Sequence, residues 1–245
     1  MQANVKFRRE EPETRMRQIY EAAEQIIARD GYSQLSAQTV AGEVGITRPL
    51  VYHYFASMNE IAEGVIERRV KRSIEDLGEI YRVPQSSSIR ESLEKGVRAL
   101  EIISQNGEIF GEPTMKKYAQ RSSSESERVA HEQTATHSPK GEETVNEETL
   151  SKNRGDNLER QDGNAELLLR YVSQVSDVVA PRLQEIMVRD IQAQHRLRIH
   201  HLDATFRIAM TGIVLGQITG RLVSRTQCEE ILAQILHVEN YMSTW

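Results

Sequence analysis

The chain has little cysteine and no recognisable secretion signal. Its one cysteine is Cys228, so no intrachain disulfide can form, and a reducing compartment such as the cytoplasm is expected. The opening residues, MQANVKFRREEPE, lack the apolar stretch of a signal peptide. We therefore do not expect a secreted domain held together by disulfides.

Long apolar runs are also missing. The most apolar stretch, Met210–Gly220, reads MTGIVLGQITG and is closely flanked by Arg207 and Arg221. A helix needs roughly 20 apolar residues to cross a bilayer, and this stretch is shorter. We expect it to form a buried helix, and we expect no membrane partner.

Catalytic and metal-binding patterns are absent as well. No Ser-His-Asp order, phosphate-binding loop or pair of carboxylates indicates an enzyme, and no cofactor is implied. His195, His200 and His201 raise the alternative of a metal site, but no carboxylate pattern accompanies them, which favours a polar turn. Cys228 has only Arg225 nearby to activate a thiolate, which favours a buried, inert thiol. We predict no catalytic and no metal-binding residues.

The residues that are present indicate a soluble, helical protein. Hydrophobic residues make up 38% and charged residues 27%, with a net charge of −5, which suits one large or two modest globular domains. Apolar residues recur at helical spacing and no stretch predicts a strand, so the expected fold class is all-α. The expected helices run from Thr14 or Pro12 to Gly31, Ser36 to Gly45, Thr47 to Phe55, about Ser57 to Tyr81, Ile89 to Ser104 with a shorter piece up to Tyr118, Ala165 to Gln192 with a break at Pro181, Leu202 to Val223, and Thr226 to Tyr241.

One segment, at about residues 120–164, differs from the rest. It is rich in Ser, Thr, Glu and Asn and has few large apolar residues. Such a composition buries too little apolar surface to offset an ordering cost of roughly 1–2 kcal/mol per residue. We predict a disordered insertion, and the alternative is a polar, exposed helix in part of it.

The stretch GITRPLVYHYF, Gly45–Phe55, follows a short helix and forms another, which predicts a helix-turn-helix motif. Val51 and Phe55, one turn apart, are expected to face inward. The opposite side then presents side chains suited to a DNA groove: donors for guanine or phosphate, apolar atoms for a thymine methyl, and hydroxyl or imidazole groups for phosphate. The expected DNA contacts are Gln38, Thr47, Arg48, Pro49, Leu50, Tyr52, His53 and Tyr54, with backbone N–H groups near Met58 and Asn59 as a further phosphate seat.

Two alternatives to DNA binding stand at this point. Tyrosine and histidine on a short helix can be half-buried packing residues, and helix-turn-helix geometry also occurs in proteins that bind no DNA. Basic and acidic residues balance one another through Glu75, which is typical of a solvated surface.

The N-terminal quarter of the chain resembles the DNA-binding domain of the tetracycline-repressor (TetR) family of bacterial regulators. The resemblance rests on AAEQIIARDGYSQLSAQTVAGEVGITRPLVYHYFASMNEI, within residues 14–76. It implies base contacts from Gln38, Arg48, Pro49 and Leu50, and phosphate contacts from Thr47, Tyr52, His53 and Tyr54.

Met58 departs from the family pattern, which usually has a lysine there. Lys6, Arg8 and Arg9 in the leader could compensate for the missing phosphate contact. We therefore expect DNA binding with a modest salt dependence.

The resemblance also implies a variable helical C-terminal domain that dimerises and encloses a small-molecule effector. Gly212, Gly216 and Gly220 recur at four-residue spacing and are expected to lie on one helix face, where another helix can approach closely. We expect these glycines, with Ile231 and Ile235, to lie at a homodimer interface; the alternative is a neighbouring helix of the same subunit. Ligand-binding residues are unassigned, because Met and aromatic residues at helical spacing favour a plain core over a cavity lining. The candidates are Phe110, Met115, Tyr118, Tyr171, Met187, Phe206 and Met210.

The sequence thus predicts a flexible arm over residues 1–13, a helix-turn-helix domain over 14–60, and a helical ligand-binding and dimerisation domain over 61–245. A long helix joins the two domains. The expected function is a ligand-responsive repressor that binds double-stranded DNA at a palindromic operator as a dimer, in the bacterial cytoplasm at the nucleoid. The alternative is a helical protein-interaction module that uses DNA binding only for localisation.

Overall fold

The structure is a computed structural model that describes residues 11–82, 88–132, 163–196, 199–221 and 224–241. These residues form helices and no strand, which confirms the predicted all-α class. None of the described helices is long and apolar enough to span a bilayer. The elements are α1 (Pro12–Asp30), the 3₁₀ turn η1 (Tyr32–Gln34), α2 (Ala37–Val44), α3 (Arg48–Tyr54), α4 (Met58–Arg82), α5 (Ile89–Glu132), α7 (Gly163–Gln192), α8 (Leu202–Ile218), α9 (Arg225–Ile235) and the 3₁₀ turn η2 (Glu239–Tyr241).

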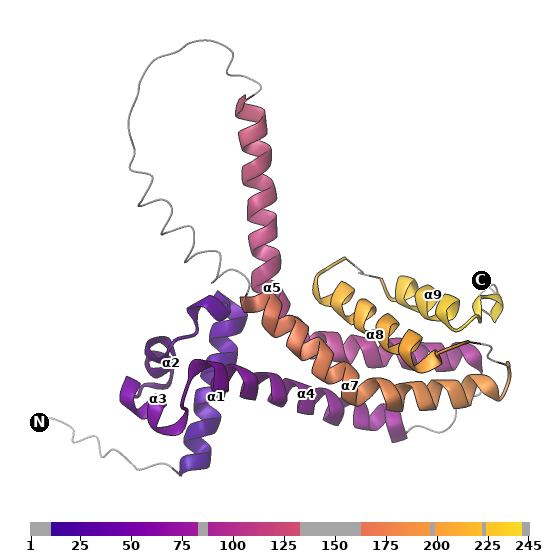
Figure 1. The fold of residues 1–245 in the computed structure, drawn as a ribbon, viewed down its shortest axis with the longest axis horizontal. Coiled ribbons are helices and arrows are strands. Elements are labelled where there is room, and N and C mark those ends of the chain that lie inside the picture. The colour runs from indigo at the N-terminus through magenta and orange to yellow at the C-terminus, as the bar shows by residue number, and fades with distance from the viewer. Residues whose placement is uncertain (1–10, 83–87, 133–162, 197–198, 222–223, 242–245) are drawn as a thin grey trace, which may run out of the picture.

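The first three helices form a small unit, here called the head (residues 12–55). α1 buries one apolar face made of Ile19, Ala22, Ala23, Ile26 and Ile27. It ends at Gly31, whose φ of 89° is a conformation that glycine adopts without a steric penalty. α2 then packs beside α1, and α3 packs beside α2, as Figure 1 shows.

α4 joins the head to the rest of the molecule. It starts beside α3 and runs out of the head beneath α7 and α5, as Figure 1 shows. Its inner face is apolar along most of its length, with Ile61, Val65, Ile66, Val70 and Leu77 buried. The predicted long helix from Ser57 to Tyr81 is therefore confirmed.

The body (α5, α7, α8 and α9) packs around α5, which contacts α1, α4, α7, α8 and α9. One continuous apolar cluster extends from the head through α4 into the body. Of the side chains that fitted either a cavity or a core, five are almost fully buried within this cluster: Phe110, Tyr171, Met187, Phe206 and Met210. For Met115 and Tyr118 the structure places the helical backbone alone.

The predicted break at Pro181 is wrong, because α7 continues through it to Gln192. Proline removes one backbone hydrogen bond from a helix, which normally weakens it. Here Val179, Ala180 and Leu183 are buried on both sides of the proline, and this packing holds the helix together.

α8 ends at Ile218, earlier than the sequence predicted. Gly220 has φ of 69°, and the N–H groups of Gly220 and Arg221 donate to the carbonyls of Gln217 and Gly216. This glycine therefore terminates the helix in a left-handed conformation. The expectation that it lies on the same helix face as Gly212 and Gly216 is wrong.

The polar segment at about 120–164 is only partly described. α5 continues to Glu132, which is the alternative of a helix in part of the segment, and residues 133–162 lie outside the described residues. Figure 1 shows the end of α5 pointing away from the body. Most of the predicted N-terminal arm, residues 1–10, also lies outside them, with Lys6, Arg8 and Arg9.

Candidate nucleic-acid interface

Both ends of α2, including the turn that leads into α3, are fixed by local capping interactions. Ser36 caps α2: its hydroxyl accepts from the N–H of Thr39, and the Thr39 hydroxyl accepts in return from the N–H of Ser36. Gly45 ends α2 with φ of 72°, and the N–H of Ile46 donates to the Ala41 carbonyl. These caps set the angle at which α3 leaves α2.

The inner side of α3 is fully packed. Val51 is 0% exposed and Phe55 is 2% exposed, which confirms that they face inward. The ring of Tyr20 on α1 meets Phe55 edge-on, with centroids 5.0 Å apart. α3 is therefore held by both α1 and its own buried residues.

The outer side of α3 faces solvent. Thr47, Arg48, Pro49, Tyr52 and His53 are exposed, as is Gln38 on α2, whereas Leu50 and Tyr54 are half-buried. The described part of the body leaves this surface uncovered, with Tyr52 45% exposed. The structure thus brings the predicted contact residues together on one accessible face, here called the α3 surface.

Two aromatic contacts order side chains on the α3 surface. The Arg48 guanidinium lies over the Tyr52 ring, 5.7 Å from its centroid. At the next two positions, the rings of His53 and Tyr54 meet edge-on with centroids 5.2 Å apart. Such contacts reduce the freedom of long side chains before binding, which lowers the entropy lost when a complex forms.

Several other basic residues of the head and α4 are bound to carboxylates. Arg29 contacts Asp30 and Glu43, and its hydrogen bonds to these groups raise its pKa. Arg68 and Arg69 both reach Glu24, at 3.4 and 2.8 Å. The described contact of Arg48, in contrast, is with an aromatic ring, so its charge is directed to the α3 surface.

The start of α4 differs from the predicted phosphate seat. The Ala56 N–H donates to a Glu60 carboxylate oxygen at 2.6 Å, and the Glu60 N–H donates to the Ser57 hydroxyl. Met58 packs against the core. A carboxylate therefore already lies at this helix end, which makes the site less favourable for phosphate than the sequence suggested. The spacing Ser57-x-x-Glu60 is a capping-box signature that could have shown this in advance.

Sequence reasoning missed one supporting pair, Tyr20 and Gly64. A Cβ added at Gly64 would lie 2.3 Å from Cε1 of the Tyr20 ring, so the glycine leaves room for the ring. Arg68 lies over the same ring, 5.4 Å from its centroid. Tyr20 is thus packed between α4 and Phe55, and no local pattern in the sequence indicates this.

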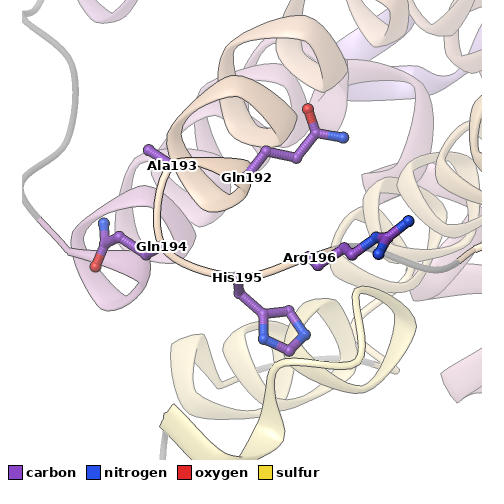
Figure 2. A pocket seen from close by; sticks show the side chains of 5 residues that line it. All are labelled: Gln192, Ala193, Gln194, His195 and Arg196. Carbon is purple, nitrogen blue, oxygen red and sulfur yellow. The ribbon is translucent and has the colours of Figure 1, made fainter.

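The histidines that raised the alternative of a metal site lie near the end of α7 and the start of α8. Gln192, Ala193, Gln194, His195 and Arg196 line a hollow of about 470 Å³ at the end of α7. Figure 2 shows His195 pointing away from its neighbours, so these side chains do not converge on one point. His201 has φ of 54° at the start of α8. Among the described residues, no group of three or more His, Cys, Asp or Glu side chains can hold a metal ion.

The residues predicted for the dimer interface have mixed exposure. Gly212 is exposed, and a Cβ there would meet nothing within 4 Å. Gly216, Ile231 and Ile235 are half-buried, and Gly220 lies beyond the end of α8. The alternative, in which Gly212 admits a helix of the same subunit, finds no support in the described residues.

Comparison with known proteins places this arrangement in a family. The profile of bacterial regulatory proteins of the tetR family matches residues 19–65, which extend from α1 into α4. Over these residues the chain carries a domain of the TetR family. This match supports a DNA-binding role for the N-terminal part of the chain.

Similarity beyond the family domain is low. A search of curated proteins finds no match. Among solved structures, a Clostridium perfringens protein proposed to regulate fatty acid metabolism is 16% identical, with a TM-score of 0.44, covering 90% of this chain and 97% of its own. A proposed TetR-family regulator from Rhodococcus sp. is 17% identical, with a TM-score of 0.46 and coverages of 92% and 98%. A TetR-like regulator from Rhodococcus sp. RHA1 is 16% identical, with a TM-score of 0.39 and coverages of 93% and 96%.

Proposed function

We propose that this TetR-family protein is a ligand-responsive repressor that binds a palindromic operator as a homodimer. The observation that carries the proposal is the two-sided character of α3. Its apolar residues Val51 and Phe55 are buried, whereas Arg48 and the side chains around it are presented to solvent. A helix supported in this way can enter a major groove without rearrangement of the head.

The roles within the α3 surface follow from chemistry. Arg48 can donate two hydrogen bonds to guanine, and Pro49 and Leu50 offer apolar contact to a thymine methyl. Thr47, Tyr52 and His53 can donate to phosphate oxygens and set the register. Gln38 on α2 reaches a base or a phosphate at the edge of the surface.

Selection of bound duplexes from random DNA tests this assignment. We expect an inverted repeat whose half-sites lie about one helical turn, or a multiple of it, apart. Replacing Tyr52 and His53 together with alanine should abolish binding of the selected duplex, measured by fluorescence anisotropy. Leu169→Ala, an exposed residue on α7, is the matched control. Unchanged binding by the double variant would refute the role of the α3 surface.

Arg48 separates base reading from phosphate binding. Arg48→Ala should lower the affinity for the selected duplex by roughly 10- to 100-fold and relax the base preference at one position of the operator. Arg182→Ala removes the same charge from the exposed side of α7 and should leave binding within about twofold.

Dimerisation is supported by an apolar face on α8. Ile208 is 74% exposed, and Gly212 lies one turn further along the same helix. Val178 on the neighbouring helix α7 is 44% exposed. Gly212→Arg should dissociate the dimer in sedimentation experiments without unfolding the chain, because nothing in the subunit lies within 4 Å of its Cβ. Leu169→Arg is the control on an exposed apolar residue outside this face.

Ligand response is supported by α4, which contacts both the head and the body. A ligand that prefers one arrangement of the body would shift the head through this helix, in proportion to its difference in affinity for the two arrangements. A thermal-shift screen of small molecules, followed by anisotropy on the selected duplex, tests it. Repression requires loss of reporter transcription in cells, and increased transcription would contradict it.

A further inference from the structure

The first turn of α7 lies against the head, far from it in sequence. The backbone N–H of Tyr32 in η1 donates to Oδ1 of Asn164 at 2.5 Å, across a separation of 132 residues. Asn164 is buried, with 9% of its surface exposed. This is a directed polar contact between the body and the turn that connects α1 to α2.

Gly163 provides a second contact, with the side chain of the same residue. A Cβ added at Gly163 would lie 2.4 Å from Cδ1 and 3.1 Å from Cε1 of the Tyr32 ring. The ring can therefore rest on the start of α7 only because residue 163 has no side chain. Backbone and ring of Tyr32 are held by consecutive residues of one helix.

The turn η1 is in turn hydrogen-bonded to the start of α2. The N–H of Leu35 donates to the Tyr32 carbonyl, and the Thr39 hydroxyl donates to the Gln34 carbonyl. α2 packs on α3 and carries Gln38. A displacement of Tyr32 is therefore passed to the helix that braces the α3 surface.

The next turns of α7 are fixed to α4. Arg170 forms an ion pair with Glu63, near the start of α4. The Tyr171 hydroxyl contacts the Ser73 hydroxyl at 2.9 Å and donates to the Ile103 carbonyl at 2.6 Å. Because these contacts fix the position of α7, its first turn provides a contact of defined position for Tyr32.

We propose that Gly163 and Asn164 are positioning residues for DNA binding, although they lie outside the DNA-binding domain. They attach η1 to the body and so fix α2 and α3 relative to α4. This role rests on the proposed function, because it is defined by affinity for the operator. The start of α7 thereby holds the head in addition to α4 and to α5, which contacts α1.

The contact is tested by Asn164→Ala, with Asn164→Asp as the conservative variant. Aspartate keeps an oxygen acceptor for the Tyr32 N–H. It loses only the Nδ2 group, which is buried without a hydrogen-bond partner, and a carboxylate is favourable in the first turn of a helix. Alanine removes the acceptor and leaves the Tyr32 N–H unpaired.

Two readouts are needed, on the full-length protein. Amide exchange of Tyr32, followed by NMR with ¹⁵N-tyrosine labelling, should accelerate roughly tenfold in Asn164→Ala and stay within about twofold in Asn164→Asp. Affinity for the selected duplex should fall roughly three- to tenfold in the alanine variant and recover with aspartate. Gly163→Ala, which displaces the ring but keeps Asn164, should weaken binding in the same range. Leu169→Ala on the same helix should change neither readout.

The outcomes distinguish this role from the proposed function. Unchanged Tyr32 exchange in Asn164→Ala overturns the contact itself. Faster exchange with wild-type affinity, or equal losses in the alanine and aspartate variants, overturns the positioning role alone. A wild-type chain that selects no duplex overturns the proposed function, and the positioning role falls with it.

Discussion

The head and the body are stabilised by different kinds of interaction. In the head, short helices are set by local caps at Ser36 and Gly45 and by an apolar core that includes Val51 and Phe55. In the body, buried polar groups bridge helices that are distant in sequence. The Tyr171 hydroxyl joins α7 to α4 and α5, and Ser104 on α5 donates to Gln217 on α8, which in turn donates to Cys228 on α9.

This difference bears on what each part can do. Local caps let the head keep its shape while one whole side of α3 stays exposed for a partner. Buried polar bridges favour one particular arrangement of packed helices, since a hydroxyl or amide that loses its partner is destabilising. The body is thus held in one defined arrangement, and the head is suited to present an unchanged surface.

The largest expected effect is on the core of the head. Phe55→Ala removes a ring that is 2% exposed and packed on Tyr20, which should lower the free energy of unfolding by about 3–5 kcal/mol. Urea denaturation followed by circular dichroism measures this loss. Tyr52→Ala, on the exposed side of the same helix, should change stability by no more than about 0.5 kcal/mol. Equal losses would mean that the two sides of α3 do not differ as described.

A smaller loss is expected from Gly64→Ala. The new methyl group would meet the Tyr20 ring, which Phe55 and Arg68 hold in place, so we expect a loss of about 1–3 kcal/mol in urea denaturation.

The matched body variant is Gly96→Ala, whose Cβ would meet the Sδ and Cε atoms of Met187. A thioether end moves easily, so its loss should be smaller than that of Gly64→Ala. A larger loss of stability in Gly96→Ala than in Gly64→Ala would show that the head accommodates an added methyl group better than the body does.

The same difference explains how far the sequence could be read. Caps, turn glycines and the spacing of Val51 and Phe55 are local signals, and they predicted the head and the α3 surface. The continuation of α7 through Pro181 and the early end of α8 depend on packing between distant helices. The Tyr32–Asn164 and Tyr20–Gly64 contacts depend on it too, and no single stretch of sequence records such packing.

The buried Tyr171 hydroxyl gives the third prediction. Tyr171→Phe removes its bonds to Ser73 and to the Ile103 carbonyl, and should lower the free energy of unfolding by about 0.5–1.5 kcal/mol at neutral pH. Tyr52→Phe is the exposed control and should change little.

The pH dependence of stability sharpens this prediction. Burial is the main cause that raises the pKa of Tyr171 above its ordinary value, and the Ser73 hydrogen bond and Arg69 oppose it. Because the folded state favours the neutral phenol, its contribution is complete below about pH 10 and is lost as pH rises further. Tyr171→Phe should therefore flatten the loss of stability above that pH. An unchanged alkaline slope would refute the role of this hydroxyl.

The smallest effect is expected at Gly78, near the C-terminal end of α4. A Cβ added there would meet nothing within 4 Å, in contrast to Gly64 on the same helix. Glycine inside a helix is less favourable than alanine by roughly 0.5–1 kcal/mol, so Gly78→Ala should stabilise the chain by that amount in urea denaturation. Gly64→Ala and Gly78→Ala make the same chemical change in one helix, and their opposite signs isolate the packing of the head on α4. A loss of stability at Gly78 would mean that α4 uses this position for a contact, with the body or with a second copy of the chain.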